Sequence, residues 1–545
     1  MRILLAQINP TIGDLDGNQK KIIESIQEAK SLFADLVLFP ELSLLGYPPD
    51  DLLLQEEFIV SLENRLFLIA KETKGIAAVV GTVRRNTAPF GKPLFNTAAI
   101  LEDQKIVGFQ DKILLPTYDV FDEARYFEPG AMVKLFDLCG KKIAVTICED
   151  IWEDQASDFF GSRYHVSPIN ELKKLKPDFV LNLSASPYSK GHLKKRRAVG
   201  SYAAIEAKAP LLYCNQVGAN DSLVFDGRSL FFEKDGKLID MAKGFKEDFF
   251  VVDYPTTLLP KELEEDELLD ISRALILGIS DYFKKLGFKK AVLGLSGGVD
   301  SAVVAFLATA ALGKENVLCI GMPSRFSTKE SLIEAKELSH NLGCSFLELP
   351  IEDPFNSYLN LLEPHFQKKP FDITEENLQA RIRGMLLMAF SNKFGHLLLN
   401  TGNKSELALG YCTLYGDMCG ALCVIGDLTK SEVYFLAKWI NRDKEIIPWN
   451  TIYKPPSAEL RENQTDQDSL PEYSLIDQVI KSHLEDNLDA KLIAEKFHYP
   501  LDTVQKLIRL IYQSEYKRQQ APPVLRISKK AFIAGRRMPI VQSWL

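Results

Sequence analysis

Lys290-Ala-Val-Leu-Gly-Leu-Ser-Gly-Gly-Val-Asp-Ser301 is the stretch that decides the fold of the second half of this chain of 545 residues. An apolar run, a pair of glycines and the apolar run 302–312 predict a strand, a tight turn and a helix. Gly297 and Gly298 let backbone N–H groups approach an anion closely, and a helix N-terminus adds partial positive charge. The stretch therefore predicts a phosphate-binding loop. It lacks the lysine of the Gly-x-x-x-x-Gly-Lys-Ser/Thr loop, which holds β- and γ-phosphates.

The first half of the chain contains short apolar runs that end in polar side chains. They are 35–40 before Glu41, 142–147 before Cys148, and 178–183 before Ser184 and Ser186, and Lys112 lies in a segment of similar character at 109–116. Reacting groups of α/β sheets gather beyond the carboxyl ends of the strands. We therefore expect these polar side chains to lie at one site.

Glutamate, lysine and cysteine together indicate acyl transfer from an amide. A thiolate at Cys148 can attack an amide carbon and hold the acyl group as a thioester. Glu41 can take the thiol proton and pass it to the leaving ammonia. Lys112 can stabilise the oxyanion and lower the pKa of the thiol. Each residue alone is more often structural, and a single Cys148 is more often a small buried hydrophobe. Only their joint occurrence after similar strands favours catalysis.

Both halves resemble known families. Phe39-Pro40-Glu41-Leu42, Asp111-Lys112 and Ile147-Cys148-Glu149-Asp150 resemble the glutamate–lysine–cysteine signature of nitrilase-type amidases. The Ser-Gly-Gly-x-Asp-Ser loop resembles that of enzymes that split ATP into AMP and pyrophosphate. The passages after it resemble NAD synthetase: Glu376-Asn-Leu-Gln-Ala-Arg-Ile-Arg383, Thr401-Gly-Asn-Lys-Ser-Glu406, Leu414-Tyr-Gly-Asp417, Pro456-Ser-Ala-Glu459 and Glu515-Tyr-Lys-Arg518. In this order the two halves resemble the glutamine-dependent NAD synthetases over essentially the whole chain.

The resemblance implies two α/β domains and one overall reaction. Residues 1–255 are expected to form a nitrilase-like α-β-β-α sandwich that hydrolyses glutamine, and 256–270 a linker. Residues 271–545 are expected to form a doubly wound parallel sheet, Rossmann-like, of the ATP pyrophosphatase type. The implied reaction adenylates the pyridine carboxylate of nicotinic acid adenine dinucleotide (deamido-NAD) and lets ammonia displace AMP. Ammonia must reach the adenylate without protonation by bulk water, so a closed path between the sites is expected.

The family's site residues carry over by position. For the amidase half the resemblance implies a catalytic set of Glu41, Lys112 and Cys148, with glutamine contacts at Tyr118, Ser186, His192 and Glu149. The family usually has a lysine or arginine at the position of His192, so Lys190 or Lys194 remains an alternative contact for the glutamine carboxylate. Glu149 orients Lys112 or the substrate amine, or is an ordinary polar neighbour.

The synthetase half supplies the implied nucleotide contacts. The ATP contacts are Gly294, Leu295, Ser296, Gly297, Gly298, Val299, Asp300, Ser301, Thr401, Lys430 and Ser457. The deamido-NAD contacts are Asn377, Glu406, Lys517 and Arg381, and Arg381 and Arg383 are equally consistent with surface or salt-bridge roles. Asp300 and Glu406 are the implied ligands of Mg²⁺, because a hard cation shared with phosphates prefers carboxylate oxygens.

Composition agrees with a two-domain enzyme. The chain is 46% hydrophobic and 25% charged, and its net charge of -8 argues against general nucleic-acid binding. No apolar leader or run of about 20 apolar residues is present, so we expect neither secretion nor a membrane span. Eight irregularly spaced cysteines favour a reducing cytoplasm. The family resemblance also implies a homo-oligomer, from dimer to octamer.

The last thirty residues are basic, and the sequence allows two interpretations of this tail. The tail is either solvated and disordered or, as Phe532, Ile533 and Trp544 favour, docked on the dinucleotide site or on another subunit.

One alternative function is an NAD synthetase that uses free ammonia and keeps the first domain as a scaffold. Another is an ATP pyrophosphatase that amidates a different substrate.

Overall fold

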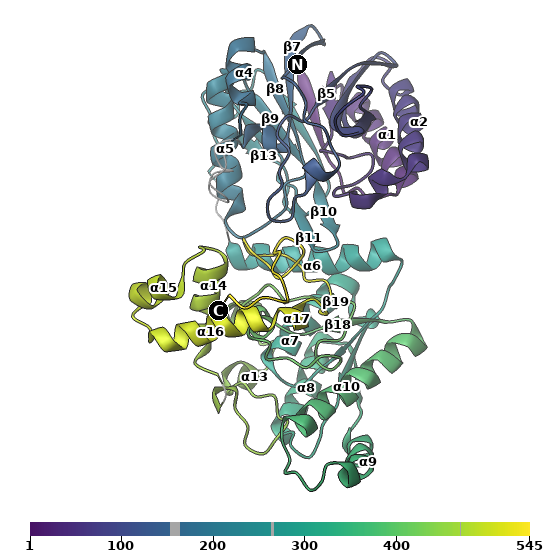
Figure 1. Ribbon diagram of the computed structural model, residues 1–545. Helices are drawn as coiled ribbons and strands as arrows, with labels where there is room; N and C mark the ends of the chain where they lie inside the picture. Colours follow the sequence, from purple (N-terminus) through teal and green to yellow (C-terminus); the bar gives the residue numbers. More distant parts are fainter. Residues whose placement is uncertain (153–163, 263–265, 469, 545) are drawn as a thin grey trace. The chain divides into compact units, whose positions relative to one another are not determined.

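The computed structural model describes residues 1–152, 164–262, 266–468 and 470–544. The chain divides into two compact units, Met1–Glu265 and Asp266–Leu545. Each unit is built on β-sheet covered by helices (Figure 1). Within the described residues, no helix is both long and apolar enough to cross a membrane.

The first unit contains two mixed sheets. One sheet has the strands β1 (Arg2–Gln7), β2 (Leu36–Leu38), β3 (Ala77–Arg85), β4 (Leu94–Glu102), β5 (Lys105–Asp111) and β14 (Asp248–Asp253). The other has β6 (Leu135–Leu138), β7 (Lys141–Ile147), β8 (Phe179–Ser184), β9 (Leu211–Asn215), β12 (Leu230–Phe232) and β13 (Leu238–Met241). Their orders are β14-β1-β2-β3-β4-β5 and β13-β12-β9-β8-β7-β6, and β10 (Val217–Asn220) pairs with β11 (Leu223–Asp226).

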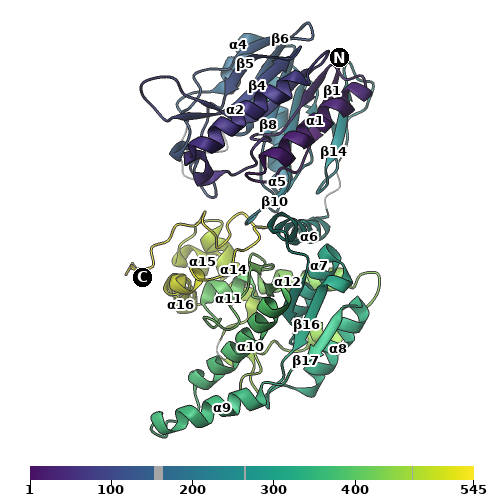
Figure 2. The ribbon, with the colours of Figure 1, turned by 90° about the vertical axis from the view of Figure 1, so that its right-hand side faces the viewer.

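Three hydrophobic layers hold the first unit together. The inner faces of the sheets pack on each other through residues such as Leu5, Leu38, Val145 and Leu181. The helices α1 (Leu15–Ser31) and α2 (Glu56–Lys71) cover the outer face of the first sheet, and Figure 2 shows them side by side. The helices α4 (Pro168–Leu175) and α5 (His192–Ala207) cover the second sheet. This is the α-β-β-α sandwich that the sequence predicts.

Strand register brings the polar strand ends together. Strands β7 and β8 run parallel, with Ile147 opposite Leu183, so Cys148 and Ser184 lie at the same edge of the sheet. Glu41 follows β2 by three residues, and Lys112 follows β5 directly. The expected gathering of polar side chains at strand ends is confirmed by this topology.

The second unit is built on one parallel sheet. Its strands are β15 (Ala291–Gly294), β16 (Val317–Gly321), β17 (Ser345–Glu348), β18 (Leu397–Asn400) and β19 (Leu422–Cys423), in the order β17-β16-β15-β18-β19. Val292 packs toward α10 (Ile373–Phe394), and side chains alternate along a strand, so its neighbours face the helices on the other side. Those helices are α6 (Glu267–Leu286), α7 (Val299–Leu312) and α12 (Lys430–Ile440). Helices on both faces make this the expected doubly wound fold.

The remaining elements complete the second unit. They are α8 (Lys329–Leu342), α9 (Glu352–Leu362), α11 (Lys404–Leu409), α13 (Trp449–Tyr453), α14 (Tyr473–Leu484), α15 (Ala490–Phe497), α16 (Leu501–Gln513) and α17 (Glu515–Arg518). The helices α14, α15 and α16 form a small hydrophobic core together with Ala408 and Leu409 of α11. The tail beyond α17 is docked at Val524, which bridges Cys423 of β19. This part of the tail is therefore docked on its own unit, and its docking on the dinucleotide site or on another subunit stays a prediction.

Candidate active sites

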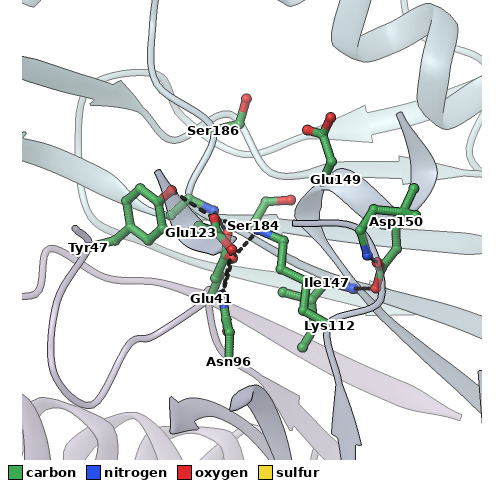
Figure 3. Close-up of polar contacts among 12 residues, drawn as sticks. Glu41, Tyr47, Asn96, Lys112, Glu123, Ile147, Glu149, Asp150, Ser184 and Ser186 are labelled. Atoms are coloured by element: carbon green, nitrogen blue, oxygen red, sulfur yellow. Dashed lines mark hydrogen bonds and ion pairs between the residues drawn. The ribbon is translucent and has the colours of Figure 1, made fainter. Parts of the chain in front are cut away.

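Lys112 lies at the centre of the first site, between two carboxylates. Its side chain is 1% exposed, and its Nζ lies 2.7 Å from Glu41 Oε1 and 2.7 Å from Glu123 Oε1 (Figure 3). Burial lowers the pKa of this lysine, but Glu123 and Glu41 outweigh that effect and raise the pKa well above its usual value. Lys112 is therefore a permanent cation in a buried site.

Glu123 is a functional candidate that the sequence analysis missed. It begins the 3₁₀ helix η2 (Glu123–Arg125), and no strand precedes it to signal its position. Tyr47 donates its hydroxyl to Glu123 Oε1 at 2.9 Å, and the amide of Asn96 donates to Glu41 at 2.7 Å and to Glu123 at 3.3 Å. These donors fix both carboxylates around Lys112. Burial raises the pKa of Glu123, although Lys112 opposes that rise.

Cys148 occupies a sharp turn at the end of β7. It starts the 3₁₀ helix η3 (Cys148–Ile151), its φ is +43°, and it is 6% exposed. A non-glycine residue with positive φ is uncommon and often marks a functional position. Burial and the charge of Glu41 raise the pKa of the thiol well above its usual value, and Lys112 opposes them. The thiol therefore needs a base to become a nucleophile.

Asp150 ties the strand of Cys148 to the strand of Lys112. Its Oδ1 accepts the N–H groups of Ile113 and Leu114 at 2.9 Å each, and its Oδ2 accepts that of Ile147 at 2.9 Å. Burial raises the pKa of Asp150 to about 7, while these N–H groups lower it. The carboxylate is a strap between the two strand ends (Figure 3).

Glu149 faces two tyrosines beside the thiol. The hydroxyl of Tyr118 donates to Glu149 Oε1 at 2.9 Å, and that of Tyr164 donates to the same oxygen at 2.9 Å. Burial raises the pKa of Glu149 to about 7. Tyr164 was not singled out from the sequence, because no motif marks it.

Ser186 and His192 lie next to each other on the far side of the site. Ser186 Oγ and His192 Nε2 are 3.0 Å apart, and the imidazole stacks on Trp152 with centroids 5.1 Å apart. The fully buried guanidinium of Arg196 donates to the carbonyl of Ser186 at 3.3 Å and to Asp226 at 2.9 Å. Arg196 therefore braces the segment after β8.

The glycine loop of the second unit has the predicted strand–turn–helix form. Gly297 has φ +80°, and an added Cβ there would lie 2.2 Å from the carbonyl oxygen of Ser331. Only glycine fits this position, because both its backbone and its surroundings exclude a side chain. Ser296 Oγ accepts the N–H of Gly298 at 3.2 Å and lies 3.1 Å from Ser301 Oγ, which shapes the loop between β15 and α7. Gly294, Leu295 and Val299 flank this turn.

Two carboxylates and a lysine meet at the first turn of α7. Lys430 Nζ forms an ion pair with Asp300 and lies 3.9 Å from Glu406 Oε1. Asn403, which caps α11, donates to Asp300 Oδ1 at 3.1 Å. Burial and the charge of Asp300 raise the pKa of Glu406 to about 8. Asp300 is thus close enough to oppose the ionisation of Glu406.

The loop 410–417 gathers three of the predicted dinucleotide contacts. Lys517 Nζ donates to the carbonyls of Gly410 and Cys412 at 2.7 Å each. Asn377 Oδ1 accepts the hydroxyl of Thr413 at 2.7 Å, and Arg381 Nε donates to the carbonyl of Leu414 at 3.2 Å.

Arg383 and Ser457 lie in other surroundings. Arg383 donates to the carbonyl of Met322, and burial lowers the pKa of its guanidinium to about 10. Ser457 is exposed, and its hydroxyl donates to the carbonyl of Gln464 at 2.6 Å, while Thr401 follows β18 directly.

Comparison with known proteins matches both units. The family model described as carbon-nitrogen hydrolase matches residues 2–257, and the model described as NAD synthase matches residues 271–521. The glutamine-dependent NAD(+) synthetases of Synechocystis sp. and Thermotoga maritima are 46% and 42% identical to the chain, covering 99% of it and 99% and 98% of their own lengths. The chain belongs to the glutamine-dependent NAD(+) synthetases. It is therefore an enzyme of the ligase class.

Solved structures agree with this membership. The structure of glutamine-dependent NAD+ synthetase from Acinetobacter baumannii in complex with ADP is 38% identical, with a TM-score of 0.77, and covers 100% of this chain and 99% of that one. A glutamine-dependent NAD(+) synthetase from Cytophaga hutchinsonii, 22% identical with a TM-score of 0.86 and coverage of 100% and 98%, shares the fold.

Most of the predicted site residues fall into two groups, one in each unit, while Arg383 and Ser457 lie apart from them. One group surrounds Cys148 in the first unit: Glu41, Lys112, Tyr118, Glu149, Ser186 and His192. In the other, Asp300, Glu406 and Lys430 meet at the glycine loop, and Asn377, Arg381 and Lys517 meet at the loop 410–417. Glu123 and Tyr164 lie outside every motif of the sequence analysis, whereas Asn403 lies inside the passage Thr401–Glu406 but was not singled out there.

Proposed function

We propose that residues 1–255 hydrolyse glutamine at Cys148 and that residues 271–545 use the ammonia to amidate deamido-NAD. The observation that carries this proposal is the buried Lys112 held 2.7 Å from Glu41 at the strand ends that also carry Cys148. A buried cation and a carboxylate beside a thiol are what amide cleavage through a thioester requires. A non-catalytic scaffold has no need of such a costly arrangement.

The residues divide the work of the first step. Glu41 accepts the proton of the Cys148 thiol as sulfur bonds to the amide carbon, and then gives the proton to the departing ammonia. Lys112, kept charged by its two carboxylates, stabilises the oxyanion that forms on the amide oxygen. Glu41 then activates a water molecule that hydrolyses the thioester to glutamate.

Glutamine is held by the polar groups around the thiol. Tyr118 and Glu149 offer a hydroxyl and a carboxylate for the α-amino end, and Ser186 and His192 face the α-carboxylate. Lys190 or Lys194 remains the alternative contact for the α-carboxylate. Stacking of His192 on Trp152 fixes the plane of the imidazole for either role.

The second unit binds ATP at the glycine loop, from Gly294 to Ser301, with Thr401, Lys430 and Ser457. Deamido-NAD contacts Asn377, Arg381, Glu406 and Lys517. The pyridine carboxylate attacks the α-phosphate of ATP, pyrophosphate leaves, and ammonia displaces AMP from the acyl-adenylate. Loop amides and Lys430 stabilise the charge that develops on the transferring phosphate.

Asp300 and Glu406 fit a magnesium ion that arrives with ATP. The side chains of Asp300 and Glu406 are half-buried, and the rise of the Glu406 pKa to about 8 indicates that the pair lacks sufficient positive charge, although Lys430 lies beside it. Carboxylate oxygens are the ligands that Mg²⁺ prefers, with phosphate oxygens completing its shell. When bound, the ion neutralises the phosphates of ATP.

We further propose that the enzyme works in the cytoplasm as a homo-oligomer. The eight cysteines are free thiols, as a reducing compartment maintains. Its small-molecule partners would be ATP, glutamine and deamido-NAD.

A diazoketone analogue of glutamine tests the assignment of Cys148. The diazo carbon takes up the proton that leaves the Cys148 thiol, the thiolate attacks that carbon, N₂ leaves, and a stable thioether forms. We expect one adduct per chain by intact-protein mass in the wild type and in Cys214→Ala, whose thiol is also buried. We expect none in Cys148→Ala, and an equal adduct on that variant would refute the proposal.

A further inference from the structure

In the second unit, the buried ion pair of Asp427 and Lys404, called the clasp below, binds the C-terminal tail. Asp427 is fully buried and accepts the N–H groups of Ile527 at 2.7 Å and Ser528 at 2.6 Å, together with the Ser528 hydroxyl at 2.8 Å. Lys404, 1% exposed, lies 3.0 Å from Asp427 and donates to Ser528 Oγ and to the carbonyl of Lys530 at 2.7 Å each. Lys404 also lies 3.2 Å from a carboxylate oxygen of Glu485.

Both charged members of this clasp stand next to the nucleotide site. Lys404 is the first residue of α11 and follows Asn403, which donates to Asp300. Asn403 and Glu406 also cap α11 reciprocally, because each side chain accepts the backbone N–H of the other, at 3.0 and 3.1 Å. Asp427 lies three residues before Lys430, the ion-pair partner of Asp300. The clasp and the site therefore share the same short segments of backbone.

The tail completes the hydrogen bonding of the clasp. Without Ser528 and Lys530, the Lys404 ammonium would lose two of its partners in a buried position. A buried charge without its partners is costly, so the surrounding backbone shifts to find others. Such a shift of Lys404 would move the first turn of α11, which carries Glu406. Neither the basic character of the tail nor any known site residue accounts for this arrangement.

We propose that the tail segment 527–530 is a positioning element of the adenylation site. Lys404 and Asp427 bind this segment through hydrogen bonds. The bound segment fixes the first turn of α11, and this turn positions Glu406 directly and Asp300 through Asn403 for the binding of ATP. Lys404 is thus a positioning residue that acts through its neighbours. This inference rests on the proposed assignment of Asp300 and Glu406 to the nucleotide site.

Ser528→Ala is the sharpest test, because it removes a single hydroxyl and leaves both charges of the clasp intact. Ser339→Ala is the matched control, since Ser339 is also buried and donates its hydroxyl to a backbone carbonyl, that of Cys344, at 2.9 Å. Titration calorimetry measures the Kd for α,β-methylene ATP with Mg²⁺, at a temperature where every variant is fully folded by circular dichroism. The KM for ATP and the KM for ammonium are measured at the same temperature.

We expect Ser528→Ala to raise the Kd of the analogue and the KM for ATP at least five-fold, with the KM for ammonium unchanged. Ser339→Ala should bind the analogue like the wild type. Equal Kd values for Ser528→Ala, Ser339→Ala and the wild type would overturn the inference and leave the tail a stabilising element only. Asp300→Ala separates the two proposals, because wild-type binding of the analogue by that variant would refute the nucleotide site itself.

Discussion

At the scale of single residues, the first site combines groups that are costly to bury. The side chains of Lys112, Glu41 and Glu123 are in direct contact, and they are only 1%, 1% and 5% exposed to solvent. Removing one partner of a buried ion pair costs about 3–5 kcal/mol, because the other charge is left uncompensated. In the native protein, hydrogen bonds from Tyr47 to Glu123 and from Asn96 to Glu41 offset part of the cost of burying the two carboxylates. The two carboxylates keep Lys112 charged, and a charged lysine is what stabilisation of the oxyanion needs. The neighbouring thiol of Cys148 has a raised pKa.

Glu149 should make stability depend on pH. Burial raises its pKa from 4.5 to about 7, so the folded protein holds a proton that the unfolded chain releases. Its contribution to stability therefore falls as the pH rises from about 4.5 to 7 and stays constant above, by roughly 3 kcal/mol at most. Glu149→Gln keeps an acceptor for Tyr118 and Tyr164 but cannot ionise. We expect the difference in unfolding temperature, variant minus wild type, to increase from pH 5 to pH 8 in calorimetry.

A flat difference across this pH range would contradict the raised pKa of Glu149. The same scans on Glu171→Gln serve as a control, because Glu171 is only half-buried and its carboxylate accepts the N–H of Val133, away from the tyrosines that contact Glu149.

The residues found from the sequence are those that follow a strong strand signal or a specific motif. Glu41 and Cys148 follow apolar runs, so their neighbourhood could be predicted. Glu123 lies in an irregular segment and reaches Lys112 only through tertiary folding, so no local pattern marks it. Tyr164 reaches Glu149 in the same way.

At the scale of elements, one carboxylate joins two strand ends. The side chain of Asp150 accepts N–H groups from the segment after β5 and from the last residue of β7. This strap fixes Lys112 relative to Cys148, which follow β5 and β7, strands of different sheets. Correct placement of catalytic groups to within about 1 Å is worth large factors in rate.

Asp150→Asn should break at least one of these bonds. An amide nitrogen cannot accept an N–H, so either Ile147 or the pair Ile113 and Leu114 loses its acceptor. An unsatisfied buried N–H costs about 1–3 kcal/mol. We expect a lower unfolding temperature and a kcat/KM for glutamine at least ten-fold lower, with ammonium-supported NAD(+) formation nearly unchanged. A variant that is as active with glutamine as the wild type would show that the strap has no role in catalysis.

The elements themselves were largely predictable. The strand–glycine–helix unit at 290–312 is confirmed, and the apolar runs 35–40, 142–147 and 178–183 correspond to the strands β2, β7 and β8. Helix α1 begins at Leu15, because Asp14 caps it by accepting the N–H of Gly17. The path of the tail could not be predicted, since it depends on Asp427 and Lys404, about 100 residues away in the sequence.

At the scale of the whole molecule, two chemistries reside in two separately folded units. The first liberates ammonia, and the second consumes it. Their separation means that a variant in one unit should have a signature that depends on the nitrogen donor. Comparing NAD(+) formation with glutamine and with ammonium therefore shows in which unit a residue acts.

Asp300→Ala should abolish NAD(+) formation with either donor. The variant removes a carboxylate beside Lys430 and Glu406 and so disturbs the adenylation that precedes any attack by ammonia. We expect at least a hundred-fold loss of kcat with glutamine and with ammonium alike, measured as AMP release. Recovery of activity by ammonium alone would place Asp300 outside the adenylation site.

The most direct test of the two-site account is NAD(+) formation by Cys148→Ala with each donor, in the presence of ATP, Mg²⁺ and deamido-NAD. The thioester is needed only to liberate ammonia, so glutamine-supported formation should fall by at least a thousand-fold. Ammonium-supported formation should stay within about two-fold of the wild type, because the second unit is unaltered. Equal loss with both donors, or substantial activity with glutamine, would contradict the account.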